Sequence, residues 1–137
     1  MRSIKIFSVM MLAGLLALAG CKKDDPTPVE MRDLTISPDN TEITVTFNQA
    51  VYANSDKTGS LDANCFQLAI YSTSQIEAQY IVDHLAGDSY VKIEMSYQDT
   101  LTGTEKIKVT ALANKIFGEE GNVLDKDISM EVRVNTP

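Results

Sequence analysis

The segment Thr41-Glu42-Ile43-Thr44-Val45-Thr46-Phe47-Asn48 indicates the fold class of this chain. Its apolar side chains Ile43, Val45 and Phe47 alternate with polar ones. Successive side chains of a β-strand point to opposite faces of a sheet, so this strand has one apolar face. An apolar sheet face must be covered by a second layer.

The same alternation recurs along the chain between turn residues such as Ser37-Pro38-Asp39-Asn40, Gly87-Asp88 and Gly103. No long helical period competes with it. The pattern predicts an all-β protein, an immunoglobulin-like antiparallel β-sandwich of about seven strands. The absence of tryptophan and of a bridging cysteine pair excludes an antibody-type module. Strands are expected at Arg32–Ser37, Thr41–Asn48, Cys65–Tyr71, Ile76–Val82, Tyr90–Met95, Glu105–Leu112 and Ile128–Val134.

Several reactive or charged side chains of this domain have simple structural interpretations. Glu105, Lys106 and Lys108 are expected on a solvated sheet face, where charges also discourage edge-to-edge pairing. His84, beside a glycine turn, is expected to be exposed. Cys65 is expected to be buried as a small apolar residue, the alternative being a reactive thiol in an oxidising compartment.

The N-terminus has the pattern of an export signal. Met1–Phe7 carries two positive charges, and Ser8–Leu18 is an apolar run too short to span a bilayer. Leu18-Ala19-Gly20-Cys21 resembles the lipobox of bacterial lipoproteins. The resemblance implies that residues 1–20 are removed and that Cys21 receives acyl chains of the palmitate type, which anchor it stably when there are two or more. The alternative is an ordinary cysteine near an uncleaved signal anchor.

Residues 21–30 are expected to form a tether before a domain at 31–137. Lys22-Lys23-Asp24-Asp25 is followed by Pro26 and Pro28, a composition typical of an extended linker. The tract is also similar to the Lys and acid tract that sends some lipoproteins of the Bacteroidota to the outer cell face. We therefore expect a lipid anchor in the outer membrane, facing the cell surface. If the charges are incidental, the domain faces the periplasm.

Charge and composition exclude several functions. The chain has 137 residues, and Arg2 and Lys5 of its 12 basic residues lie in the signal, which leaves 10 against 19 acidic ones, a formal charge of about −9. A nucleic-acid-binding surface is not expected at this charge. Because the chain has one histidine, a metal site built from several histidines is not expected. No catalytic motif is present, so we expect no enzyme activity, no catalytic residue and no cofactor.

Five fragments between Leu34 and Val134 follow one another in an order that a known family shares. They are Pro38 with Val45-Thr46-Phe47-Asn48 and Val51-Tyr52, Phe66-Gln67-Leu68, Leu101-Thr102-Gly103, Ile107-Lys108-Val109-Thr110 and Gly121-Asn122-Val123-Leu124. On these fragments the domain resembles the bacterial Ig-like domains of the SbsA type, also called Big_5 domains. The resemblance implies a spacer, adhesion or scaffold module without catalytic residues. Gln49-Ala50 and Gly118 depart from the family pattern.

Oxygen-bearing side chains gather around the glycine turn near the end of the chain. They are candidate calcium ligands, because calcium accepts carboxylate and amide oxygens in flexible arrangements. A polar hairpin at Gly121-Asn122 explains the same residues without a metal. A melting temperature that rises with calcium would support the metal site. The candidates are Glu119, Glu120, Asn122, Asp125 and Asp127.

Tyr52, Tyr71 and Tyr97 stand at strand ends, where a ring can stack on a sugar, fill a partner's pocket or simply cap a loop. The leading prediction is a non-catalytic envelope lipoprotein, bound to the bilayer through acylated Cys21, for adhesion, scaffolding or binding of a protein or extracellular polymer. The alternative is an accessory glycan-binding lipoprotein of a polysaccharide-uptake system.

Overall fold

Seven β-strands make up the part of the chain that the computed structural model describes, residues 24–137. The expected signal peptide at residues 1–20, the lipidation site Cys21 and Lys22-Lys23 lie outside the described residues. The strands are β1 (Met31–Ile36), β2 (Glu42–Phe47), β3 (Phe66–Tyr71), β4 (Ala78–Asp83), β5 (Tyr90–Tyr97), β6 (Lys106–Ala111) and β7 (Ile128–Arg133), with a 3-10 turn η1 (Ala63–Cys65) before β3.

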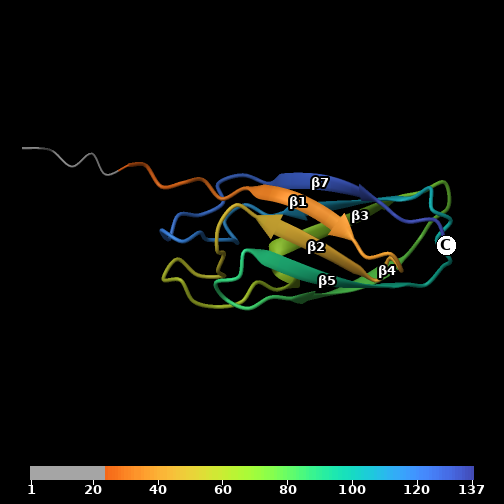
Figure 1. Ribbon diagram of the computed structural model, residues 1–137, viewed down its shortest axis with the longest axis horizontal. Helices are drawn as coiled ribbons and strands as arrows, with labels where there is room; N and C mark the ends of the chain where they lie inside the picture. Colours follow the sequence, from red (N-terminus) through yellow and green to blue (C-terminus); the bar gives the residue numbers. More distant parts are fainter. Residues whose placement is uncertain (1–23) are drawn as a thin grey trace, which may run out of the picture.

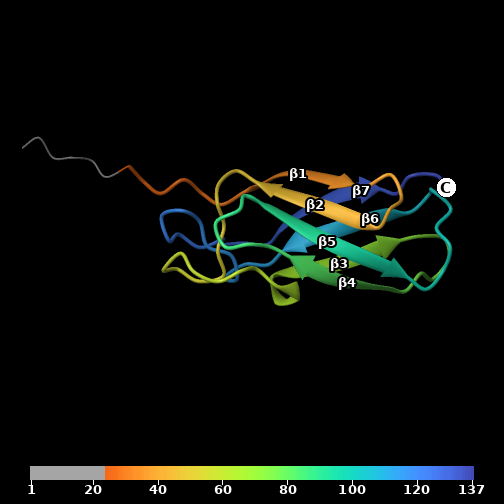
Figure 2. The same ribbon diagram turned by 60° about the horizontal axis from the view of Figure 1, so that its bottom comes forward.

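The strands form two antiparallel sheets packed face to face (Figures 1 and 2). One sheet has the order β1-β2-β5-β4 and the other the order β3-β6-β7. This is the strand order of the constant-type immunoglobulin sandwich. The edge strands β1 and β7 lie against each other on one side, which leaves β3 and β4 as the edges of the other side. The predicted Ig-like sandwich is therefore confirmed.

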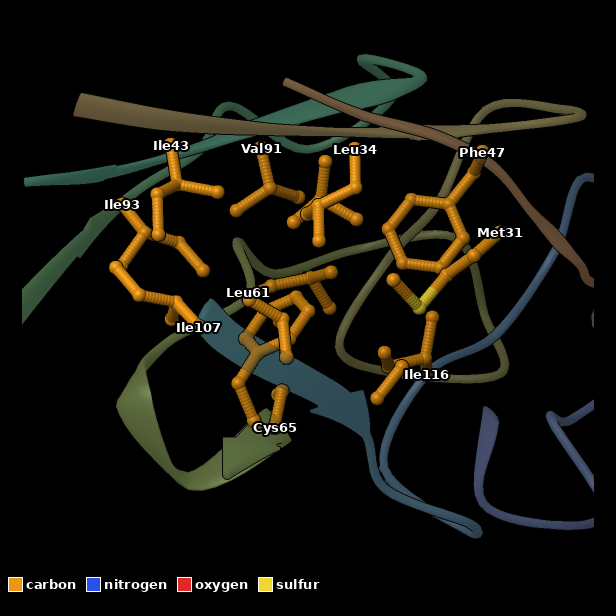
Figure 3. Packing of buried hydrophobic residues seen from close by; sticks show 14 of the residues in the cluster. Met31, Leu34, Ile43, Phe47, Leu61, Cys65, Val91, Ile93, Ile107 and Ile116 are labelled. Atoms are coloured by element: carbon orange, nitrogen blue, oxygen red, sulfur yellow. The ribbon is translucent and has the colours of Figure 1, made fainter. Parts of the chain in front are cut away.

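The core lies between the sheets and consists of the alternating residues that the sequence predicts. Ile43 and Val45 of β2, Ile93 of β5, and Ile107 and Val109 of β6 are 0% exposed. In Figure 3, Ile43 and Ile93 point from the four-stranded sheet toward Ile107 of the other sheet. Each such side chain stabilises the fold by about 1.5–3 kcal/mol through removal of apolar surface from water.

The bounds of β4 differ from those that the sequence predicts. The strand was expected at residues 76–82, but it begins at Ala78 and ends at Asp83. Pairing sets these limits, because Ala78 lies opposite Tyr97 at the end of β5 and Asp83 lies opposite Lys92. Ile76 still packs on the core, although it precedes the strand.

The expected burial of Cys65 is confirmed, with 5% of the residue exposed. Its backbone belongs to η1, whose first amides are capped by Asp62, and strand pairing begins at the next residue. The Sγ atom lies 3.7 Å from the Lys115 carbonyl oxygen. Burial raises the pKa of the Cys65 thiol. The thiol is therefore held in its unreactive form.

The prediction that Glu105 lies exposed is wrong, because only 1% of the residue is exposed. Glu105 lies two residues before the buried Ile107, so strand alternation turns both side chains inward. Its carboxylate accepts hydrogen bonds from the Thr102 N–H at 3.0 Å, the Thr102 hydroxyl at 2.7 Å and the Gly103 N–H at 2.9 Å. The turn between β5 and β6 thus closes around a buried carboxylate.

The prediction that His84 lies exposed is also wrong, because 7% of the residue is exposed. Its Nδ1 accepts the Leu61 N–H at 3.0 Å, and its Nε2 lies 3.1 Å from the Asp88 carbonyl oxygen. These contacts fit the tautomer with the proton on Nε2. The loop after β4 folds back onto the β2–β3 connection, where the Gly87 N–H donates to the Val51 carbonyl, and this buries the ring.

Candidate functional site

The loops of the sandwich gather at two opposite ends (Figure 1). The N-terminal segment shares one end, called here the N-terminal end, with the connections at residues 48–65, 84–89 and 112–127. The connections at residues 37–41, 72–77 and 98–105 share the other end, the C-terminal end, with the chain terminus. The predicted site residues divide between these ends.

The segment that precedes β1 is fastened to the N-terminal end. The Thr27 carbonyl accepts hydrogen bonds from Gln49 Nε2 at 2.9 Å and from Asn122 Nδ2 at 2.8 Å. Asn48 Nδ2 donates to the Pro28 carbonyl at 2.8 Å, and Val29 is a core residue at 3% exposure. The chain therefore leaves the body of the domain at Thr27.

The candidate calcium ligands lie on the β6–β7 connection, and several of them bind backbone amides. Glu119 Oε1 accepts the Ala50 N–H at 3.1 Å, and Asp127 Oδ1 accepts the Ala113 N–H at 2.8 Å. Glu120 Oε1 lies 3.4 Å from the Thr27 nitrogen. Within residues 24–137, no three His, Cys, Asp or Glu side chains are placed to hold a metal ion. The calcium site stays a prediction.

Gly118 has a steric role in this connection. A Cβ atom there would collide with Gln49 Oε1 and lie 2.8 Å from Asn122 Oδ1. Gln49 Oε1 also accepts the Glu119 N–H at 2.9 Å. Gln49 is not among the predicted site residues, because its contacts with Thr27 and Glu119 join segments that lie far apart in the sequence. Glycine at 118 is what lets Gln49 reach Thr27.

The three candidate contact tyrosines are not brought together. Tyr52 lies at the N-terminal end, where its backbone pairs with Phe117 and its ring packs beside Gly87. Tyr71 and Tyr97 lie at the C-terminal end, as the last residues of β3 and β5. Tyr71 is 50% exposed. It is thus the candidate whose ring is most available to a ligand.

Tyr97 lines a shallow cavity of about 480 Å³ at the C-terminal end, between the β1–β2 turn and the residues after β5. Its hydroxyl donates to the Asn40 carbonyl at 2.9 Å, and burial raises the pKa of Tyr97 to about 12. On the cavity rim, hydrogen bonds from Ser37 and Thr41 lower the pKa of Asp39. The cavity has both polar and apolar lining residues and is built around the turn that the sequence predicts.

Comparison of the chain with protein-family models, curated proteins and solved structures finds no match. Among residues 24–137, no helix has the length and hydropathy that a membrane span requires.

Proposed function

We propose that this protein is a non-catalytic lipoprotein of the cell envelope, anchored in the outer membrane through acylated Cys21. Its Ig-like domain serves adhesion, scaffolding or the binding of a protein or extracellular polymer. The lipobox-like segment before Cys21 carries the anchoring part of this proposal.

The hydrogen bonds that hold Thr27 indicate which end of the domain would lie near the membrane. Thr27 is held by Gln49 and Asn122 at the N-terminal end of the sandwich. An extended chain spans at most about 3.6 Å per residue, so a lipidated Cys21 keeps this end within roughly 20 Å of the bilayer. The opposite end, with Tyr71 and the C-terminus, then points away from the membrane.

A non-catalytic role is supported by the contacts of two side chains that often carry catalysis. Both ring nitrogens of His84 make hydrogen-bond contacts to backbone atoms, so neither faces a substrate. The Cys65 thiol is buried under the β6–β7 connection. A general base or nucleophile must instead reach the reacting atom directly.

The anchor is tested by growing cells with a clickable palmitate analogue. We expect the wild-type protein to be labelled and to sediment with membranes, and Cys21→Ser to be unlabelled and soluble or retained as precursor. Cys65→Ala is the matched control and should be labelled like wild type. Labelling of Cys21→Ser at the wild-type level would contradict the proposal.

The orientation is tested by treating intact cells with protease and following a C-terminal tag, with lysed cells as the control. Loss of the tag from intact cells supports presentation on the cell surface. Protection in intact cells, with digestion after lysis, would instead place the domain on the periplasmic side.

The accessory glycan-binding role is a second candidate, favoured by one observation. The exposed ring of Tyr71 lies beside Lys106 on the outer face of the three-stranded sheet. Aromatic rings and cations are the groups with which proteins hold acidic sugars.

A further inference from the structure

A row of three exposed side chains crosses the three-stranded sheet at its C-terminal end. Tyr71 of β3 lies opposite Lys106 of β6, which in turn lies opposite Arg133 of β7. All three are exposed, and Tyr71 and Arg133 end their strands while Lys106 begins its own. Directly opposite residues of antiparallel strands lie about 4.5–5.5 Å apart at Cβ. We call these three residues the Tyr71 row.

The row places two like charges directly opposite each other, although exposed Glu131 lies two residues from Arg133 on the same face of β7. Lys106 and Arg133 oppose each other directly, an arrangement that destabilises a sheet. Within the described residues, the ion pairs are Arg32–Glu30 and Lys92–Glu42, so neither cation of the row is paired. Lys108, two residues further along β6 on the same face, lies opposite Glu131 without forming an ion pair. A cationic patch thus stands on a chain with a net charge of −7.

Protection of a sheet edge does not explain these cations. Charged residues guard edge strands against pairing with other chains. β6 is the central strand, bonded to β3 on one side and β7 on the other, so Lys106 and Lys108 stand on an interior strand. The interpretation of the lysines as edge protection is therefore wrong, and the repulsion between Lys106 and Arg133 needs another explanation.

We propose that the Tyr71 row binds an acidic polysaccharide, with its carboxylate or sulfate groups held by Lys106 and Arg133. The guanidinium of Arg133 offers a planar pair of donors that matches such groups, and Lys106 adds a compact charge beside it. The ring of Tyr71 provides a flat surface on which one sugar can stack. An anionic ligand also removes the repulsion between the two cations.

The charge of the whole chain selects among anionic polymers. Duplex DNA carries one negative charge per about 1.7 Å, and the net charge of −7 on the chain repels so dense a charge. A polysaccharide with about one acid group per sugar is repelled less and gains the ring contact with Tyr71. The proposal rests on the proposed function in one respect: the anchor turns the row toward polymers outside the membrane.

The test uses the full protein in detergent micelles and measures binding by calorimetry. The probes are polygalacturonate and chondroitin sulfate, with neutral dextran and a short DNA duplex as controls. We expect binding of an acidic polysaccharide that weakens as salt rises, and weaker or absent binding of dextran and DNA. Failure of both acidic polymers to bind at low salt, or equal binding of dextran or DNA, would overturn the proposal.

Variants assign the binding to the row. Lys106→Gln/Arg133→Gln should weaken binding at least tenfold, about the effect of losing one charged hydrogen bond, with an unchanged or higher melting temperature because repulsion is relieved. Tyr71→Ala should weaken binding but retain its salt dependence. The matched control, Lys126→Gln, removes an exposed lysine at the N-terminal end and should bind like wild type.

Three outcomes of the variant series would overturn the proposal. One is wild-type binding by Lys106→Gln/Arg133→Gln. Another is an equal loss of binding in Lys126→Gln, which would indicate attraction by overall charge alone. The third is a wild-type dimer that this double variant abolishes, since the row would then be a contact between two copies. None of these results depends on the palmitate labelling of Cys21, so failure of the row and failure of the anchor are distinguishable.

Discussion

Asn40 and Asn135 hold each other across a separation of 95 positions in sequence. The Asn135 N–H donates to Asn40 Oδ1 at 2.7 Å, and Asn40 Nδ2 donates to the Asn135 carbonyl at 3.0 Å. Asn40 is 6% exposed and has a left-handed backbone with φ of 62°. One residue therefore both completes the β1–β2 turn and fixes the end of the chain.

Two replacements of Asn40 separate the contribution of its side-chain hydrogen bonds from that of its left-handed backbone. Asn40→Ala should lower the free energy of unfolding by about 2–4 kcal/mol, through lost hydrogen bonds and left-handed strain. Asn40→Gly relieves the strain and should lose about 1 kcal/mol less. Urea unfolding measures both, and hydrogen exchange at the Asn135 amide should quicken in each. Equal losses for alanine and glycine would contradict the assigned strain.

Glu105 should make the stability of the folded protein depend on pH in the acidic range. Burial alone raises the pKa of Glu105, but hydrogen bonds from Thr102 and Gly103 lower it below its ordinary value of 4.5. A carboxyl with a lowered folded-state pKa stabilises the fold above its unfolded-state pKa, and this contribution is lost as the pH falls through the folded-state value.

Glu105→Gln tests this dependence. The variant should lose about 1–3 kcal/mol at neutral pH, because the backbone donors of the turn lose the carboxylate that they share. The difference from wild type should shrink as the pH falls through the folded-state pKa of Glu105, which lies below 4.5, because wild-type Glu105 then becomes protonated. Glu131→Gln, on an exposed position of β7, should stay within about 0.5 kcal/mol of wild type. A difference that does not change with pH would argue against the lowered pKa.

Tyr97 should be the most resistant tyrosine to alkali. Burial raises its pKa to about 12 from an ordinary value of 10.0. The stability that this shift provides is complete below the ordinary pKa and is lost as the pH rises through the folded-state value. Absorbance titration of Tyr97→Phe should lack the latest phenolate step, whereas Tyr71→Phe should retain it. Loss of that step in Tyr71→Phe would show that the raised pKa belongs to Tyr71 and not to Tyr97.

All seven strands could be predicted because alternation is a local signal that needs no knowledge of the partner strand. The same rule places Glu105 inward with Ile107, although a carboxylate ordinarily favours an exposed position. His84 could not be placed, since its burial depends on the Leu61 amide 23 positions away. Local patterns cannot show which loops will meet.

The candidate surfaces were predictable only in part. Tyr71 was found by its place at a strand end, but its neighbours Lys106 and Arg133 follow from strand register across two pairings. Register is set by the whole sheet, so the sequence alone did not indicate the row. The fastening of Thr27 likewise depends on side chains from two distant connections.

Cys65 should resist modification in the folded protein. Burial raises the pKa of its thiol and shields Sγ from solvent. In a Cys21→Ser background, a thiol reagent should label Cys65 at least about 100-fold more slowly than a peptide, since labelling waits for local opening. Cys65→Ser should cost more stability than Cys65→Ala, because serine buries a hydroxyl in place of a weakly polar thiol. Labelling at the peptide rate would contradict the buried position.

Gly118 and Gln49 should be coupled through the space that they share. In Gly118→Ala, the new Cβ collides with Gln49 Oε1 and lies 2.8 Å from Asn122 Oδ1. Overpacking of this kind should lower the free energy of unfolding by about 1–3 kcal/mol. Because Gln49 and Asn122 also hold Thr27, limited proteolysis should cleave the segment before β1 faster in this variant. Gln49→Ala opens the space, so Gly118→Ala should cost less in that background, a coupling of at least about 0.5 kcal/mol. Additive effects of the two substitutions would show that Gly118 is not required by its contact with Gln49.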